Sequence, residues 1–268
     1  MIINPYVFAG PTYDTDAQAY FTANTAITSG ADKNAINQFY LDLKSFGIYS
    51  KLRAMYLWKW GSASADKWNM INPQDTNSAF RCNFATGFTY STSGITANGT
   101  SAYVDTFLVP STTSGITQNS ISGGVYCRTN KTGSNSRYAF GLTQVIGANG
   151  VDFGINMRTG TNNSIFSAND ATGGGIAITD SRGFYQVSRT NSTSKNRGLN
   201  TYSNVLGNSS GVNTLKVYFF AYNSSSGTQY YDNYQSPFGY IGTGLTLTEM
   251  ANFRTCLQTL MTYFGINV

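Results

Sequence analysis

Short runs of alternating apolar and polar residues, separated by small turn residues, fill most of the chain after residue 68. Residues 80–84 (FRCNF) alternate strictly, which is the period of two that places one face of a strand on a core. The dipeptide Asn98-Gly99 predicts a hairpin turn because Gly adopts positive φ without steric cost. Residues 68–106 therefore predict several strands of one sheet sandwich.

Further short extended runs follow as far as residue 222. They cover residues 121–128, 137–143, 151–158, 176–179, 184–189 and 215–222. Turns rich in Gly, Asn and Ser separate them, and no repeat of fixed period is present. This pattern predicts a mostly β fold, a two-sheet antiparallel jelly-roll sandwich.

Helical patterns appear only near the two ends of the chain. Residues 15–23 predict a short helix capped by Asp14 or Thr15. Residues 33–46 predict a stronger helix, with Asp32 as its N-cap and Gly47 at its end.

The strongest helical signal is at the C-terminus. Thr246 and Glu249, the only Glu in the chain, fit a capping box. An apolar stripe follows over residues 250–264 and ends before Gly265. Between the N-terminal helices and the sandwich, residues 48–60 predict a turn and a strand, with Leu52, Ala54, Tyr56 and Trp58 on one face.

Composition limits the classes of function. The 268 residues suffice for one domain, 14–268, after an apolar lead, 1–13, which we interpret as an anchor or oligomerisation segment. Charged residues make up only 11% of the chain, and the net charge is +5, so we expect no nucleic-acid partner. No apolar run is long enough for a membrane helix. The three cysteines are widely spaced, which favours free buried thiols.

Five ordered segments carry a resemblance to a known group of proteins. They are AINQFYLDLKSFGIYSKLRAMY, KWNMINPQD with the following AFR, NGTSAYVDT, DSRGFYQVSRT and IGTGLTLTEMANF. Together they resemble bacteriophage virion proteins with a concanavalin A-like (lectin/glucanase, laminin-G-like) jelly roll, frequent in phages of Bacteroidota, including crAss-like phages. The resemblance spans about residues 14–268. It implies a head or tail fibre or decoration subunit, made in the host cytoplasm and displayed on the virion surface.

Catalytic groups are scarce. The E-x-D-x-x-E pattern by which glucanases of this fold place two carboxylates is absent, and there is no His to act as general base. Asp105 near Asp66 or Asp75 would be the remaining carboxylate pair, although such residues usually form turns. We expect no catalytic residue, no metal and no cofactor. A Ca²⁺ site of Asp, Asn and carbonyl oxygens, as in many lectins of this fold, stays open as an alternative, although no D-x-D-x-D-G loop supports it here.

One basic and aromatic stretch is the candidate binding surface. It contains Arg182, Tyr185, Arg189, Lys195, Arg197 and Tyr202. One interpretation is a solvated hairpin. The other is a contact with an acidic virion protein or an anionic host polysaccharide, with Arg donating bidentate hydrogen bonds and Tyr stacking on sugar. Trp60 joins this set as a sugar platform, whereas Trp58 and Trp68 are expected in the core.

Three functional hypotheses follow. The first is a non-enzymatic structural protein of a phage virion. It would be a homo-oligomer, with a trimer as the expected state, that contacts capsid or tail proteins and host surface glycan. The second is a carbohydrate-binding receptor module at the tail. The third is a glycan depolymerase.

Overall fold

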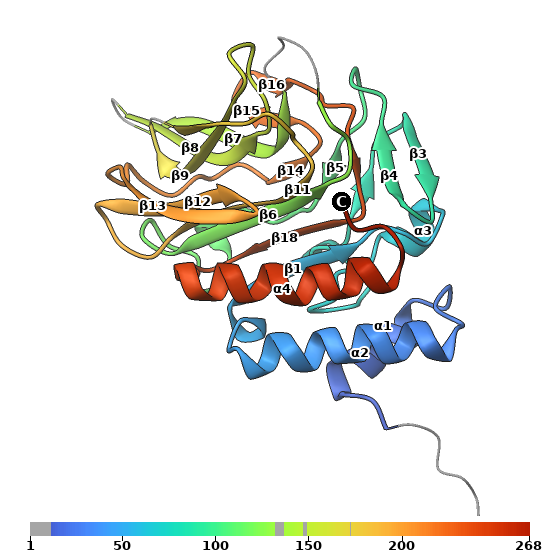
Figure 1. Ribbon diagram of the computed structural model, residues 1–268. Coiled ribbons are helices and arrows are strands. Elements are labelled where there is room, and N and C mark those ends of the chain that lie inside the picture. The colour runs from blue at the N-terminus through green and yellow to red at the C-terminus, as the bar shows by residue number, and fades with distance from the viewer. Residues whose placement is uncertain (1–11, 132–136, 147–148, 172) are drawn as a thin grey trace, which may run out of the picture.

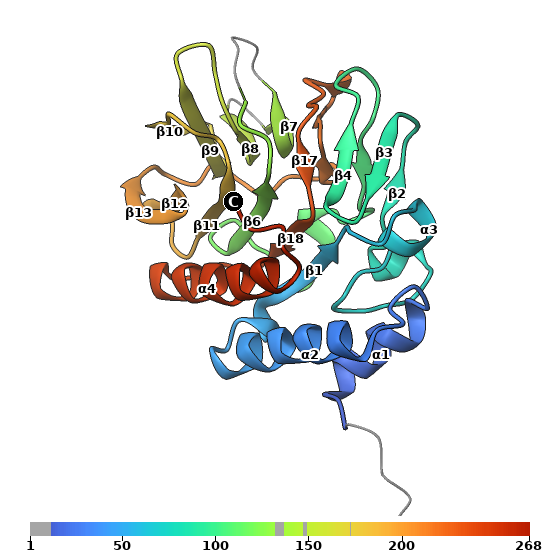
Figure 2. The ribbon, with the colours of Figure 1, turned by 45° about the vertical axis from the view of Figure 1, so that its right-hand side comes forward.

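The computed structural model describes residues 12–131, 137–146, 149–171 and 173–268. Figures 1 and 2 show two packed sheets, with the helices α1, α2 and α4 together on one side. The lead that we interpret as an anchor lies, apart from its last two residues, outside the described residues. No helix in the described ranges is long and apolar enough to cross a membrane.

The first sheet has six strands in the order β1-β18-β6-β11-β12-β13. Their bounds are β1 Leu52–Leu57, β6 Ile121–Cys127, β11 Gly183–Arg189, β12 Ser194–Leu199, β13 Thr201–Leu206 and β18 Phe238–Gly242. All its pairings are antiparallel. The sandwich predicted from the sequence is therefore confirmed, and this sheet is its layer next to the helices.

The second sheet has nine strands in its ladder, with the main order β10-β9-β8-β7-β14-β5-β2. Their bounds are β2 Asn83–Phe84, β5 Val104–Asp105, β7 Tyr138–Ile146, β8 Asn149–Asn156, β9 Asn163–Asp170, β10 Gly174–Ala177 and β14 Tyr218–Phe219. The hairpin of β15 (Tyr222–Ser224) and β16 (Gly227–Gln229) joins beside β7. A small third sheet contains β3 (Phe88–Ser91), β4 (Gly94–Ala97) and β17 (Gln235–Ser236).

The helices are α1 (Thr15–Ala23), α2 (Gly30–Ser45), the short α3 (Ala63–Asp66) and α4 (Leu247–Tyr263). Three 3-10 turns cover Tyr49–Lys51, Asn77–Ala79 and Pro110–Thr112. Asp14 caps α1 and the Thr246–Glu249 capping box starts α4, both as predicted. Helix α2 begins earlier than predicted, because the Ser29 side chain accepts the backbone N–H of Asp32 and so acts as the cap.

Two apolar cores result from this layering. The first lies between the sheets and contains Tyr56 and Trp58, and the second lies between the six-stranded sheet and the helices. Leu52 belongs to the second core, contrary to the prediction that it shares a face with Tyr56 and Trp58. The cause is a register shift between Leu52 and Ala54 in the pairing of β1 with β18, which reverses the alternation.

The opening stretch departs from its pattern at two points. Phe80 has a left-handed φ of 58° after a 3-10 turn, so only Asn83–Phe84 forms a strand. Asn98-Gly99 makes a turn but no hairpin, because β4 and β5 belong to different sheets. The Asn98 Oδ1 atom accepts the backbone N–H groups of the next residues and holds the turn without a strand partner.

Candidate functional site

The predicted basic stretch does not form one surface. Arg189 and Lys195 are almost fully buried, and both pair with Asp170 on β9. Arg197 is only 9% exposed. Tyr185 lies in the core between the sheets and donates its hydroxyl to the carbonyl of Ser181. The prediction that these residues together form an exposed binding surface is therefore wrong.

The reason for this burial is the place of β11 and β12 in the sheet. Both are interior strands of the six-stranded sheet, with the second sheet on one face and α4 on the other. A strand covered on both faces buries even its polar residues. The predicted solvated hairpin is excluded by the same geometry.

Two residues of the stretch stay near solvent. Arg182 makes an exposed pair with Asp180, with an Nη2–Oδ2 distance of 2.6 Å. Tyr202 is half-buried, and its hydroxyl donates to the carbonyl of Phe184 at 3.2 Å. Neither residue lies beside Trp60 in a common pocket.

Trp60 is instead part of a groove at the α1 and α3 end of the molecule. The groove has a volume of about 410 Å³, and its walls include the rings of both Trp60 and Trp68. The other lining residues are Ala23, Asn24, Thr25, Ala26, Ser62, Ser64, Ala65 and Lys67. Trp58, by contrast, is fully buried and stacks on Tyr56, with ring centroids 5.6 Å apart. The expectation of a core position is thus confirmed for Trp58 but not for Trp68.

Hydrogen bonds made by Asn24, Ser62 and Trp60 fix the walls of this groove. Asn24 ends α1, and its Nδ2 atom donates to the carbonyl of Ala65 at 2.9 Å, which ties α1 to α3. Ser62 caps α3 through a bond from the backbone N–H of Ala65. The Trp60 indole donates to the hydroxyl of Tyr20 at 3.2 Å, so its ring is fixed before any ligand arrives.

The groove also offers polar groups. The Lys67 ammonium lies 4.8 Å from the centre of the Trp68 ring and pairs with Asp75. Aromatic walls with a few polar groups are the usual construction of a small-ligand site, and this volume falls within the usual range.

A buried carboxyl lies behind the groove wall. Asp66 is 1% exposed; its Oδ1 atom accepts the backbone N–H of Trp60 at 2.8 Å, and its Oδ2 atom has no partner among the described residues. Burial raises the pKa of Asp66 to about 7, against the smaller opposing effects of its hydrogen bonds and of Lys59. Asp66 therefore exchanges a proton near neutral pH.

The other carboxylates considered from the sequence have separate partners. Asp105 pairs with Lys216 at 2.8 Å, and Asp75 pairs with Lys67 and Arg81. Within the described ranges, no group of three or more His, Cys, Asp or Glu side chains is placed to hold a metal ion.

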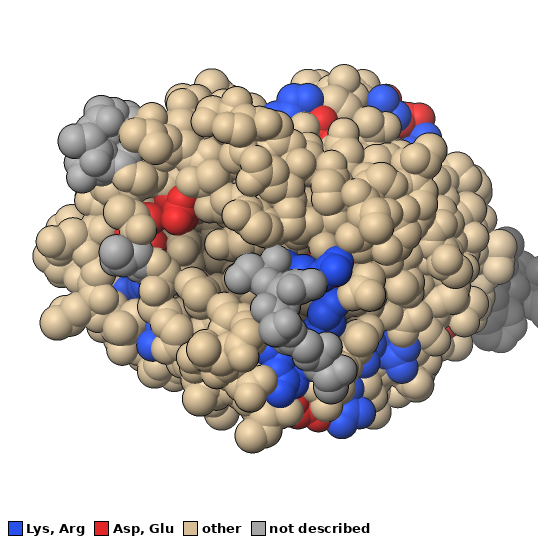
Figure 3. Space-filling model, turned by 90° about the horizontal axis from the view of Figure 1, so that it is seen from above, with Lys and Arg blue, Asp and Glu red and all other residues tan. Residues whose placement is uncertain are grey.

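The side of the molecule opposite the helices is mainly uncharged (Figure 3). Tyr138, Tyr222 and Tyr230 gather around the β15–β16 hairpin, and the rings of Tyr138 and Tyr222 stack at 4.1 Å. Tyr222 is only 6% exposed and donates its hydroxyl to Asp152. These tyrosines hold the hairpin on the sheet, and Tyr230 keeps a ring that is 50% exposed.

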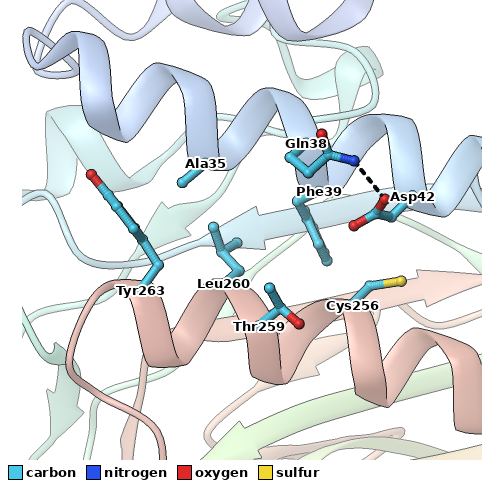
Figure 4. Close-up of a pocket in the computed structure, with 8 residues that line it drawn as sticks. All are labelled: Ala35, Gln38, Phe39, Asp42, Cys256, Thr259, Leu260 and Tyr263. Carbon is cyan, nitrogen blue, oxygen red and sulfur yellow. Dashed lines mark hydrogen bonds between the residues drawn. The ribbon is translucent and has the colours of Figure 1, made fainter.

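A smaller cavity of about 180 Å³ separates α2 from α4. Figure 4 shows Ala35 and Phe39 of α2 on one side and Leu260 of α4 on the other, with a Gln38–Asp42 hydrogen bond at the rim. Its lining is mainly apolar, without the convergent polar groups of the tryptophan groove. We interpret it as incomplete helix packing.

From the sequence, Trp68 was expected in the core and Asp66 was considered only as a carboxylate partner of Asp105, so neither was predicted at this groove. The interval of eight residues between Trp60 and Trp68 carries no periodic signal, since α3 and its flanking turns bring the two rings to one groove. The available signal was local: Ser62, Ser64 and Lys67 place small polar groups and a cation between two tryptophans.

No family model and no curated protein matches the chain. Among solved structures, it is similar to Trypanosoma rangeli sialidase in complex with sialic acid, with 10% identity and a TM-score of 0.51, over 84% of this chain and 39% of that one. The same sialidase in complex with a difluoro-KDN gives 9% identity, a TM-score of 0.50, and coverage of 85% and 40%. The chain thus spans about two fifths of the sialidase.

A third similar structure is domain 4 of AbnA, a GH43 extracellular arabinanase from Geobacillus stearothermophilus, in complex with arabinotriose. It has 12% identity and a TM-score of 0.49, over 76% of this chain and 98% of that domain. At these identities the likeness shows the fold. It also contradicts the prediction that the chain is not an enzyme, because a protein named as a sialidase contains this fold. The sandwich gives no ground for excluding catalysis.

Proposed function

We propose that this chain is a glycan-recognition module whose binding site is the groove between Trp60 and Trp68. The observation that carries the proposal is the presence of two tryptophans and a lysine in one groove, with the Lys67 ammonium beside the Trp68 ring. The apolar C–H face of a sugar packs on an aromatic ring, while its hydroxyls need nearby donors and acceptors. The groove supplies both.

The fold of the neighbours supports this assignment without defining the sugar. The sialidase and the arabinanase domain were solved with sialic acid and arabinotriose. These two sugars are therefore the first probes, followed by surface polysaccharides of the producing organism or its host.

Tryptophan fluorescence tests the proposal directly. The chain has three tryptophans, of which Trp58 is buried between the sheets. We expect a bound glycan to change the emission of Trp60 and Trp68. Trp68→Ala should weaken binding tenfold or more, about 1.4 kcal/mol, with little change in thermal stability because the ring is half-buried at the surface.

Tyr230→Ala is the matched control, since it removes a 50% exposed ring outside the groove. It should leave binding unchanged. Equal affinity in the wild type and Trp68→Ala, with both proteins folded, would refute the proposed site.

We further propose that the module is displayed on a phage particle, on the head or the tail. The resemblance of its five segments to virion proteins supports this placement. Mass spectrometry and cryo-electron microscopy of purified particles test it. Density on the particle is the expected result, and absence of the chain from particles would contradict it.

A further inference from the structure

The end of the sandwich far from the tryptophan groove is an open edge between the two sheets. Strand β10 ends the nine-stranded sheet, and β13, which pairs with β12, ends the six-stranded sheet. In Figure 2 these strands lie on the same side of the molecule, away from α3. The charged side chains of β12 lie inside this edge.

Two of the three cations here are compensated. Arg189 places Nη2 3.0 Å from the Oδ2 atom of Asp170, and its Nε and Nη1 atoms donate to backbone carbonyls. Lys195 pairs with the same carboxylate. Asp152 lies opposite Asp170 in the pairing of β8 with β9, and it accepts hydrogen bonds from Thr143 and Tyr222.

Arg197 is different. Its side chain is 91% buried, since its exposed fraction is 9%, and its Nε and Nη1 atoms are buried without any hydrogen-bond partner. Burial alone lowers the pKa of Arg197, with no contribution from a described carboxylate. The guanidinium lies directly against the backbone of β10, because a Cβ atom added to Gly174 would be 2.9 Å from Nε.

A buried guanidinium without a counter-charge is costly, by several kcal/mol in general. Even with Asp152 counted, Arg189, Lys195 and Arg197 exceed the carboxylates Asp170 and Asp152 by one charge. The planar fork of an arginine is suited to bidentate binding of carboxylate, sulfate or phosphate oxygens. This cluster of charges therefore has one positive charge without a matching negative charge.

A groove continues along the same two strands. It has a volume of about 400 Å³, and Ile176 of β10, Leu199 of β12 and Arg182 line it. Ile176 and Leu199 each lie two residues beyond Gly174 and Arg197, on the same strand faces. A chain of sugars along this groove can thus run beside Arg197.

We propose that Arg197 is an oxyanion-binding site at the open edge, which takes the carboxylate or sulfate group of an acidic glycan. The site is separate from the tryptophan groove and does not depend on it. Free sulfate shares the ligand chemistry, so the test must distinguish the free ion from a glycan-borne group.

Isothermal titration calorimetry with sodium sulfate, an oligogalacturonate and a neutral maltooligosaccharide provides the test. We expect the wild type to bind the oligogalacturonate, and Arg197→Met to lose that binding at least tenfold. Binding of sulfate with equal affinity would identify the free ion as the source. Arg81→Met, which removes a cation that already pairs with Asp75 and lies outside this groove, should bind like the wild type.

Two readouts separate binding from a structural role. Arg197→Met should fold at least as stably as the wild type without ligand, because Met removes an uncompensated buried charge. Arg197→Lys keeps a charge but loses the fork, so it should bind about tenfold more weakly. If the wild type binds neither anion, or if Arg197→Met binds equally well, the proposal is wrong. Trp68→Ala should retain anion binding, so failure of the groove proposal would be seen separately.

Discussion

Two buried carboxylates at opposite ends of the sandwich are held in contrasting ways. Asp170 lies between the sheets and meets the ammonium of Lys195 and the guanidinium of Arg189. Asp66 lies beside the tryptophan groove, accepts the backbone N–H of Trp60 and leaves its second oxygen without a partner. Both side chains are 1% exposed. They are equally buried, but only Asp170 has cations paired with its carboxylate.

This difference distinguishes a buried charge that is paired within the fold from a buried carboxyl that can take up a proton. The carboxylate of Asp170 pairs with the cations of Arg189 and Lys195. Removal of the carboxylate would therefore leave both cations buried without it. Asp66 avoids the cost of a buried charge by taking up a proton, and its pKa accordingly rises to about 7. Arg197 cannot become neutral in this way, because a guanidinium stays protonated at any ordinary pH.

We expect the largest effect on stability from removing the paired carboxylate of Asp170. Asp170→Asn removes the carboxylate and leaves Arg189 and Lys195 buried without it. We expect the free energy of unfolding at pH 8 to fall by about 3–5 kcal/mol, the usual effect of breaking a buried pair. Urea denaturation measures it.

Two matched changes sharpen this comparison. Asp66→Asn at pH 8 should not destabilise the protein, because the amide avoids the cost of a buried, ionised carboxylate. Asp180→Asn should have little effect, since its partner Arg182 is exposed. A loss in Asp66→Asn as large as that in Asp170→Asn would contradict the distinction between the two regions.

The pH dependence of stability gives the next largest effect. The pKa of Asp66 is about 7 in the folded chain and near its ordinary value of 3.8 in the unfolded chain. Between these values the folded state binds more protons, so stability falls as pH rises, by about 1.4 kcal/mol per pH unit from this group. Above pH 7 the loss is complete.

Urea denaturation of the wild type and Asp66→Asn at several pH values isolates this contribution. The difference in unfolding free energy should change steadily between about pH 4 and pH 7 and stay constant above it. A difference that is flat across this window would show that the carboxyl is ionised throughout.

Much of the fold could be predicted from the sequence, because the strands that cover one apolar core alternate or are β-branched. Strands β6 and β11 and the capping box of α4 have this local signal. Strands β9, β12, β13, β16, β17 and β18 were missed. Strand β12, with the sequence SKNRGL, has the polar composition of a turn, and only its place between a sheet and a helix makes it a buried strand.

The binding residues were harder to predict for the same reason. A run of basic and aromatic residues was interpreted as a surface, yet alternation in β11 and β12 sends Tyr185, Lys195 and Arg197 between the sheets. Whether a buried charge is compensated depends on Asp170, which lies far away along the chain on β9. No local pattern contains that information. Of the predicted residues, Trp60 lies in the tryptophan groove and Arg182 lines the groove along β10 and β12.

The smallest expected effect concerns the uncharged cavity between α2 and α4, where neither compensation nor titration operates. Ala35→Leu places an apolar side chain in this space of about 180 Å³. We expect the free energy of unfolding to rise by about 1 kcal/mol, the usual gain from filling a cavity. Ala31→Leu, at an exposed position of the same helix, should give no such gain. Because no ionisable group is changed, the gain should be the same at pH 5 and pH 8. Destabilisation by Ala35→Leu at both pH values would instead mean that the two helices pack too rigidly to accept the larger side chain.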